Sequence, residues 1–203
     1  MLSMNTSTLT SYRKAVQALN LLASKKGGSI NKMKAIKLIY FADRLHLRKY
    51  GRPIVGDMYF AMKLGPVGSR IKRSADLEEG LPDVISSYAR KYIRTSDDKK
   101  IIDSLKVPDK NVFSETDLKC LDAVYEVFAD RDQFELAKLT HEYPEWSKHE
   151  RTLRSGKKRV PMDYDDFFST GGKQDTIFAQ DPRTLALSKD QFEESREVEH
   201  ILA

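Results

Sequence analysis

The chain has little cysteine and no long hydrophobic run, and each shortage excludes a class of protein. Cys120 is the single cysteine in 203 residues, so there is no internal disulfide and no zinc site built from several cysteines. No apolar run approaches the roughly 20 residues that span a bilayer. The N-terminal sequence MLSMNTSTLTSYRK also lacks the charged-then-apolar order of a secretory signal. We therefore expect a cytoplasmic protein without a membrane partner.

Motifs of the common enzyme classes are also missing. His141 and Glu142 begin a pattern similar to that of zinc proteases, but the fourth residue after His141 is Glu145, and Pro144 interrupts the helix that would present both ligands. The other histidines have no ligand set nearby in the sequence. No serine lies in a Gly-x-Ser-x-Gly turn, and no glycine-rich stretch fits a phosphate-binding loop. We therefore expect no enzyme: no catalytic residue, no metal site and no cofactor.

Charge is distributed unevenly along the chain. Residues 163–203 carry ten acidic and four basic side chains, whereas residues 1–162 carry twenty acidic and thirty-one basic ones. The net charge is therefore −6 over residues 163–203 and +11 over residues 1–162. A basic part of this kind is suited to nucleic acid, to an acidic protein partner or to its own acidic tail, and composition alone does not rank these.

The stretch from Ile36 to Ile71 carries the clearest structural signals. Apolar residues over 36–47 lie on more than one side of a 3.6-residue helix, which predicts a central, largely enclosed helix that Gly51 ends. The apolar run Met58–Met62 predicts a short strand. Gly65 and Pro66 predict the start of another helix, because proline suits a first helical position.

Elsewhere the sequence predicts mainly helices. Capping residues and apolar periodicity indicate where they begin: at Thr10 or Ser11, at Ser29 or Asn31, at Ser114, at Asp132, at Pro144, at Asp163 and at Ser188. A hairpin formed by Tyr92–Arg94 and Ile101-Ile102 is expected to pair with the Met58–Met62 strand. Cys120 is expected in a helix core.

The expected fold class is mainly α (α+β). It consists of a compact helical domain with a small β-hairpin or short antiparallel sheet, plus a C-terminal appendage. The composition changes after Phe168 to Ser, Thr, Gly and charged residues. The predicted units are therefore a domain over 1–168 and an acidic tail with a terminal helix over 169–203.

The segment LIYFADRLHLRKYGRPIVGDMYFAMKLGPV resembles the core signature of the Panacea domain, the family of SocA-like antitoxins and phage-associated proteins. The residues that carry the resemblance keep its order and spacing: Leu38, Tyr40, Tyr50-Gly51-Arg52-Pro53-Ile54, Asp57, Tyr59, Ala61 and Gly65-Pro66-Val67. A weaker resemblance continues through the helix near Ser114 and the segment from His141 to Trp146. Together, the two parts of the resemblance cover roughly residues 10 to 168 and leave the tail unassigned.

The resemblance implies an antitoxin of a toxin–antitoxin system. Such a protein has no chemistry of its own and neutralises a toxin, usually encoded beside it, by direct binding. A related mode is a proteolytic adaptor that hands the toxin to a cellular protease, and the sequence does not choose between the two.

Two rival classes remain, a nucleic-acid-binding regulator and an enzyme with an unrecognised site. Nucleic acid is the less expected partner, but clustering of Arg70, Lys72, Arg73 and Lys157–Arg159 on one surface would favour it. A deep pocket lined by His141, Glu142 and Asp57 would favour an enzyme.

Tight neutralisation concentrates binding energy in a few aromatic and arginine anchors. The candidate partner-binding residues are Tyr50, Arg52, Asp57, Tyr59, Arg70 and Trp146. Each has a structural alternative, because the turn from Tyr50 to Asp57 joins a helix to a strand and Trp146 suits a core position. The acidic tail is a further candidate, since residues 182–203 either fold on a partner or cover the basic part until a partner displaces them.

Overall fold

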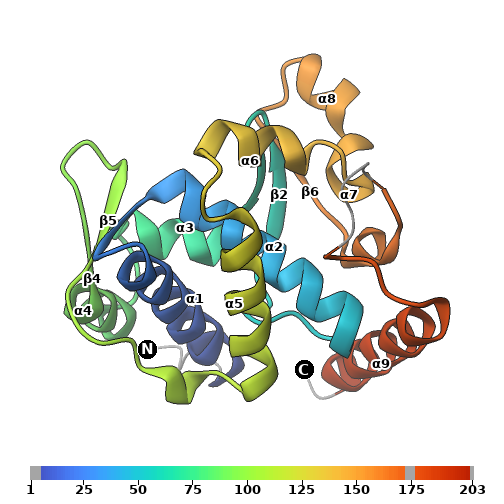
Figure 1. Ribbon diagram of the computed structural model, residues 1–203, viewed down its shortest axis with the longest axis horizontal. Coiled ribbons are helices and arrows are strands. Elements are labelled where there is room, and N and C mark those ends of the chain that lie inside the picture. The colour runs from blue at the N-terminus through green and yellow to red at the C-terminus, as the bar shows by residue number, and fades with distance from the viewer. Residues whose placement is uncertain (1–5, 172–176, 202–203) are drawn as a thin grey trace.

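The computed structural model describes residues 6–171 and 177–201, without the side chains of 199 and 200, and is built around helix α2 (Lys32–Tyr50) (Figure 1). Every residue of α2 from Lys34 to Arg48 is buried, which confirms the prediction of an enclosed helix. The helix begins at Asn31, whose side chain accepts the backbone N–H of Lys34 at 3.1 Å. It ends at Gly51, where φ is 64°.

Other helices surround α2 on several sides (Figure 1). The elements packed against it are α1 (Thr6–Lys25), α3 (Ser69–Ala75), α5 (Glu115–Phe128), α6 (Gln133–Thr140), the 3₁₀ helix η2 (Tyr164–Phe168) and α9 (Pro182–Ile201). The remaining helical elements are α4 (Asp83–Tyr92), η1 (Lys110–Val112), α7 (Pro144–Ser147) and α8 (Glu150–Arg154). Capping boxes at Ser114 and Asp132 and an Asp163 cap confirm three of the predicted starts.

In the described part of the chain, two antiparallel sheets of three strands complete the fold, which confirms a mainly α architecture with small β content. Their orders are β1-β5-β4 and β3-β2-β6. The strands are β1 (Ser29–Asn31), β2 (Tyr59–Met62), β3 (Gly65–Gly68), β4 (Ile93–Thr95), β5 (Ile101–Ser104) and β6 (Arg159–Pro161). The β4–β5 hairpin was predicted correctly, but its predicted pairing with β2 is wrong: β5 pairs with β1 instead. Strand β1 is too short to give a periodic signal of its own.

The predicted helix start at Gly65-Pro66 is also wrong. Gly65–Gly68 forms strand β3, paired with β2 through Met62 opposite Gly65. Gly65 has a φ of +90°, and a Cβ there would lie 2.2 Å from Thr140 Oγ1, so only glycine fits this tight turn. Pro66 is tolerated because β3 is an edge strand. Helix α3 begins three residues later, at Ser69.

The segment after Phe168 packs into the same core as the rest. Phe178 is fully buried against Phe41 and Phe128. Arg48 of α2 donates hydrogen bonds to the carbonyl oxygens of Phe167 and Phe178, both at 2.9 Å. The division at 168/169 stays a prediction, but the described residues on its two sides share buried contacts with α2.

The terminal helix starts earlier than predicted, at Pro182 and not at Ser188. The Asp181 carboxylate accepts the backbone N–H of Thr184 at 3.0 Å and so caps the first turn. Phe192 of this helix is buried against Tyr164 and Phe168 of η2. Helix α9 therefore lies on the side of the molecule formed by α2 and η2 (Figure 1).

Two further properties concern the whole molecule. Cys120 is buried in the core, as predicted, and burial raises the pKa of its thiol to about 12. Among the described helices, none combines the length and apolar character that crossing a lipid bilayer requires.

Candidate functional site

Asp43 of α2 forms hydrogen bonds with the backbone of the turn over residues 51–57, which joins α2 to β2. The Oδ1 atom of Asp43 accepts the backbone N–H groups of Ile54 and Val55, both at 2.9 Å, and Oδ2 accepts the Tyr59 hydroxyl at 2.9 Å. Burial raises the pKa of Asp43 to about 7, although the three hydrogen bonds favour the carboxylate and lower the pKa in part. Asp43 therefore fixes the shape of the turn.

Asp57 has a similar structural role at the other end of the turn. Its carboxylate accepts the backbone N–H of Arg70 at 2.9 Å and of Ile71 at 2.8 Å, in the first turn of α3. Its Oδ1 also accepts the N–H of Met58 at 2.7 Å. The side chain is buried, and burial raises the pKa of this carboxyl. Asp57 thus caps a helix across a sequence gap of more than ten residues.

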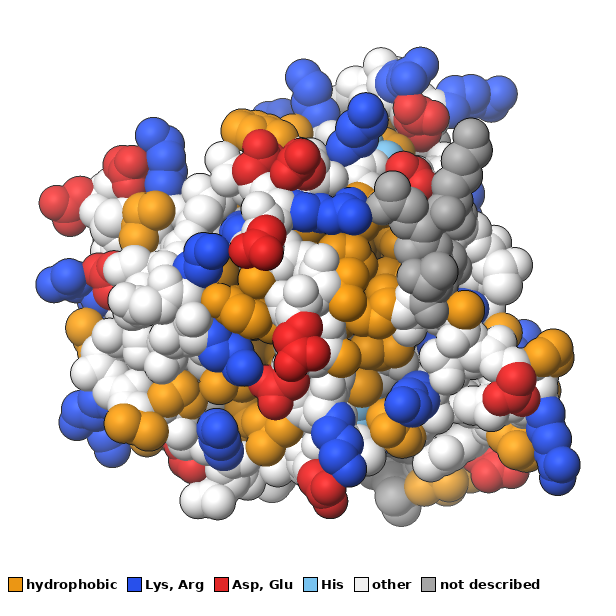
Figure 2. All heavy atoms as spheres, viewed as in Figure 1, with side chains coloured by type: hydrophobic (Ala, Val, Ile, Leu, Met, Phe, Trp, Pro, Cys, Tyr) orange, Lys and Arg blue, Asp and Glu red, His pale blue; other side chains and the backbone are white. Residues whose placement is uncertain are grey.

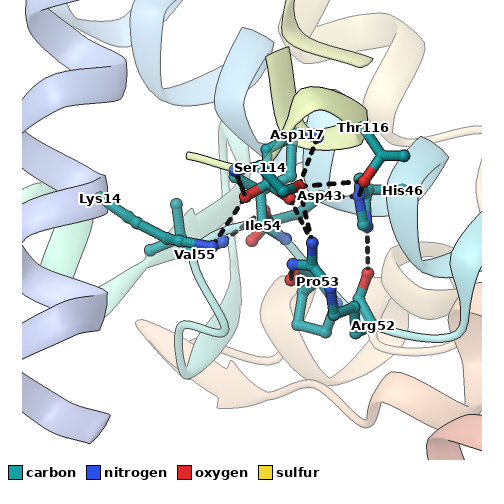
Figure 3. A network of polar contacts seen from close by, with 10 residues as sticks. All are labelled: Lys14, Asp43, His46, Arg52, Pro53, Ile54, Val55, Ser114, Thr116 and Asp117. Carbon is teal, nitrogen blue, oxygen red and sulfur yellow. Dashed lines mark hydrogen bonds and ion pairs between the residues drawn. The ribbon is translucent and has the colours of Figure 1, made fainter. Parts of the chain in front are cut away.

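A network of polar contacts converges on Asp117, at the start of α5 (Figure 3). Lys14 of α1 and Arg52 of the turn each lie 2.8 Å from its carboxylate, and the backbone N–H of Ser114 donates to it at 3.0 Å. Burial by itself raises the pKa of Asp117, but the Lys14 ammonium, the Ser114 N–H and Arg52 outweigh it, so the pKa lies below its ordinary value. One buried carboxylate thus joins α1, the turn and α5.

His46 of α2 completes this network (Figure 3). Its Nδ1 donates to the carbonyl oxygen of Arg52 at 2.7 Å, and its Nε2 lies 2.9 Å from Thr116 Oγ1. Burial lowers the pKa of His46 to about 4, so the ring is neutral at pH 7 although Asp117 Oδ1 lies 3.1 Å away. Nε2 then accepts the hydroxyl proton of Thr116.

A second buried polar cluster lies on the other side of α2. Glu145 of α7 accepts the Tyr40 hydroxyl at 2.6 Å and Arg44 Nε at 2.7 Å. The Arg44 and Glu145 side chains are fully buried. The Arg44 guanidinium also lies over the Tyr143 ring, 4.3 Å from its centre. This cluster attaches α7 to α2.

The six candidate partner-binding residues divide into two groups by exposure. Asp57, Tyr59 and Trp146 are buried, and their polar atoms are used inside the fold. Trp146 donates its indole N–H to the Met62 carbonyl at 2.9 Å and stacks on His141 with ring centres 3.6 Å apart.

Tyr50, Arg52 and Arg70 are half-buried and retain surface for a partner. Arg52 and Arg70 line the same cleft, whereas Trp146 lines a different one. The structure therefore does not bring the six residues together into one surface, and their role in partner binding stays a prediction.

The first cleft, here called the turn cleft, has a volume of about 1020 Å³. Its walls come from the start of α1, the turn, residues 161–164 and α9. Its cations are all paired with carboxylates: Lys14 and Arg52 with Asp117, Arg70 with Asp57, and Arg196 with Asp165. Among the described residues, each cation that lines the turn cleft is thus held by a carboxylate of the same chain, and Asp117 holds two of them.

The second cleft, here called the hairpin cleft, has a volume of about 960 Å³ and lies between the β2–β3 hairpin, the start of α2 and α8. Its apolar lining residues are Met33, Ile36, Met62, Leu64, Val67, Trp146 and Leu153. Its basic lining residues are Lys32, Lys37, Lys63, Lys72, Arg154, Lys157 and Lys158. Within residues 6–171 and 177–201, the only acidic residue in the lining of this cleft is Glu150, which pairs with Arg154.

Lys37 lies at the bottom of the hairpin cleft and is 1% exposed. Its ammonium donates to the Pro66 carbonyl at 2.6 Å. Burial lowers the pKa of Lys37 to about 7, so a fraction of this side chain is neutral at physiological pH.

The arrangements that would have favoured a rival function are only partly present. Lys72, Lys157 and Lys158 line one cleft, as a nucleic-acid surface would require, but Arg70 lies in the other. His141 also lines the hairpin cleft, without Glu142 or Asp57. Within residues 6–171 and 177–201, no group of three or more His, Cys, Asp or Glu side chains is placed to hold a metal ion.

Sequence reasoning missed the buried ionisable side chains that organise both sides of α2. They are Asp43, Arg44, His46, Arg48, Asp117 and Glu145. A signal was present, because a helix predicted to be enclosed carries four of them between positions 43 and 48, and buried charges need partners. The sequence did not indicate which partners these would be.

A protein-family model matches the central part of the chain. The model described as "Antitoxin SocA-like, Panacea domain" matches residues 36–147, just over half of the chain. The matched range begins in α2 and ends in α7, and it includes the turn and the β2–β3 hairpin. Neither the curated proteins nor the solved structures contain a match to the chain.

Proposed function

The chain belongs to the SocA-like antitoxin family, defined by the Panacea domain, and from this premise we propose that it neutralises a partner toxin by direct protein binding. The family match over residues 36–147 is the observation that carries the proposal. The toxin is a protein encoded nearby, and the complex forms in the cytoplasm. In this proposal the antitoxin occludes the toxin and performs no reaction of its own, so it needs neither cofactor nor metal.

The surfaces inside the matched range support binding rather than chemistry. A dissociation constant of 1 nM corresponds to about 12 kcal/mol, which interfaces usually concentrate in a few well-packed anchors. The matched range supplies most of the apolar lining of the hairpin cleft and the half-exposed side chains of Tyr50, Arg52 and Arg70. These surfaces rest on elements fixed by the buried networks around α2, so little ordering is needed on binding.

A nucleic-acid-binding regulator is the second candidate, because Lys72, Lys157 and Lys158 gather along one cleft. Phosphate contacts of this kind give binding that falls steeply with salt. The apolar lining between these lysines does not suit a phosphate backbone, so we rank this candidate below protein binding.

The test is growth of a bacterial host that expresses the adjacent open reading frame, with and without this protein, combined with affinity purification of the pair. Direct neutralisation predicts that growth is restored and that the two proteins purify as a stable complex. The toxin should remain present at an undiminished level in the rescued cells.

Two other results would replace the proposal. Rescue accompanied by loss of the toxin, and abolished in a host that lacks the responsible protease, would establish the proteolytic adaptor mode. A harmless neighbouring protein together with salt-sensitive retention on DNA would establish the regulator. Repeating the purification in that protease-deficient host separates complex formation from degradation.

A further inference from the structure

The hairpin cleft has an apolar surface that the described part of the chain leaves uncovered. Leu64, at the tip of the β2–β3 hairpin, is 47% exposed, and Met33, Met62 and Leu153 are partly exposed beside it. The Trp146 ring lies beneath them, fixed by its hydrogen bond to Met62 and its stack on His141. A supported apolar surface of this kind is typical of an interaction site.

The rim of this cleft carries unbalanced positive charge. Lys63, Lys157 and Lys158 are exposed and form no ion pair within residues 6–171 and 177–201. Figure 2 shows Lys and Arg side chains gathered at the end of the molecule that carries α8. Charge of one sign around an apolar lining selects an occupant with the opposite charge around an apolar face.

The acidic C-terminal helix of the same chain does not fill the cleft. Helix α9 packs against α2 and η2, and its residues Phe192, Ser195 and Arg196 line the turn cleft instead. Its Arg196 pairs with Asp165 of η2. Within the described residues, α9 is therefore not the segment that covers the hairpin cleft.

The backbone of the cleft favours a helix over an added strand as the occupant. Strand β3 is the edge of its sheet, but Pro66 has no N–H to donate, and the Pro66 carbonyl already accepts the Lys37 ammonium. Recognition must therefore rely on side chains, as it does when an amphipathic helix lies in a groove.

We propose that the hairpin cleft binds an acidic amphipathic helix of the partner toxin. The apolar face of that helix packs against Leu64, Met33 and Leu153, and its glutamates or aspartates pair with Lys63, Lys157 and Lys158. The inference rests on the proposed function for the identity of the partner, but the chemistry of the cleft can be tested without it.

A direct test uses the full chain and a synthetic probe. The probe is a labelled helix of leucine and glutamate about 18 residues long, or five turns, with leucines at i, i+3, i+4 and i+7. A peptide with lysine in place of each glutamate is its control, and unlabelled duplex DNA is a competitor. Fluorescence anisotropy should give saturable binding of the acidic peptide only.

Two cleft variants and two matched controls locate the binding. Leu64→Asp and the double variant Lys157→Glu/Lys158→Glu should each weaken binding of the acidic peptide about tenfold, a loss of about 1.4 kcal/mol. Val107→Asp is the control for Leu64→Asp, because Val107 is also an exposed apolar residue. Lys106→Glu/Lys110→Glu is the control for the double lysine variant, because both of its lysines are exposed. Both controls lie outside the cleft and should bind as the wild type does.

Three results would overturn the inference: equal binding of the lysine peptide, cleft variants that bind as the wild type does, or DNA that displaces the peptide and binds more tightly. The growth assay keeps this failure separate from failure of the proposed function. If the wild type and both cleft variants rescue growth equally, the antitoxin role stands and the cleft assignment falls. If the wild type does not rescue, the antitoxin role falls, and the peptide measurements still decide what the cleft binds.

Discussion

The turn cleft and the hairpin cleft are similar in volume but use their charges differently. In the turn cleft, Lys14 and Arg52 both contact the buried Asp117, and so the cations join α1 and the turn to α5. In the hairpin cleft, Lys157 and Lys158 extend from an exposed loop around an apolar lining. The cations of the first are part of the fold, whereas Lys63, Lys157 and Lys158 of the second are exposed and form no ion pair with the described residues.

This difference shows why a count of basic residues does not locate a binding surface. Arg52 belongs to the family signature, and Arg70 lies within the matched range. Both line the turn cleft, yet each pairs with a buried carboxylate of its own chain. A paired cation must break an existing contact before it binds a partner, and an unpaired exposed lysine needs only to lose water.

The largest expected effect concerns the segment that carries one wall of the turn cleft. Phe178→Ala removes a fully buried ring that packs against Phe41, Phe128 and Tyr143. We expect the free energy of unfolding to fall by about 3–5 kcal/mol, because a cavity remains in the core. Urea denaturation measures it, with Leu187→Ala, at a 60% exposed site in α9, as the control. An equally small loss for both variants would show that this segment is not integrated into the core.

The second effect tests the internal pairing of the turn cleft. Asp117→Asn keeps the shape of the side chain but removes the charge that Lys14 and Arg52 contact. We therefore expect the free energy of unfolding to fall by about 3 kcal/mol at pH 7. The difference in free energy of unfolding between the variant and the wild type should become smaller as the pH falls below about 4. The pKa of Asp117 is lower in the folded than in the unfolded chain, so the carboxylate stabilises the fold fully only at a pH where the unfolded chain also has it ionised. Urea denaturation at pH 7 and pH 3 measures both, with the exposed Glu115→Gln as control. A constant difference across this range would exclude the charge as the cause.

The third effect tests the buried cation of the hairpin cleft. The unfolded chain keeps the Lys37 proton up to a pH of about 10.5, whereas the folded chain releases it at about 7. Unfolding therefore takes up a proton between these values, and the free energy of unfolding rises with pH. The rise is at most about 1.4 kcal/mol per pH unit. Lys37→Met should remove it between pH 7.5 and 9, which denaturation at three pH values measures. Parallel pH dependence in the two proteins would contradict a lowered pKa.

The smallest expected effect is also the sharpest contrast between the clefts. Lys157→Glu/Lys158→Glu should change the free energy of unfolding by less than about 0.5 kcal/mol, because neither side chain supports the fold. Thermal unfolding measures this change. The same variant should weaken binding of an acidic helix, so stability and binding separate at the hairpin cleft. A loss of stability near that of Asp117→Asn would place these lysines among the structural charges.

Local signals in the sequence predicted much of the fold correctly. Ser114, Asp132 and Asp163 begin helical elements where their side chains predicted them, and Asn31 is one of the two predicted caps of α2. These predictions hold because a cap acts on backbone N–H groups only two or three residues away. The end of α2 at Gly51 is a local property of the same kind.

Pairing between distant residues could not be predicted in this way. The partner of β5 is the three-residue strand β1, and Lys14 meets Asp117 across 103 positions of sequence. Gly65-Pro66 has the composition of a helix start, but it forms an edge strand paired with β2. Thr140 packs so closely against Gly65 that no side chain fits there. These outcomes depend on which elements pack together.

The sequence by itself determined the enclosed central helix, the mainly α class, the family and the basic excess of the chain before residue 163, because these depend on composition and short-range pattern. Only the tertiary structure decided which charges face each other. It paired Asp117 with Lys14 and Arg52 and left Lys157 and Lys158 around an apolar cleft. The physical reason is that the effect of a charge depends on burial and on its nearest partner, and both are set by contacts between residues far apart in the chain.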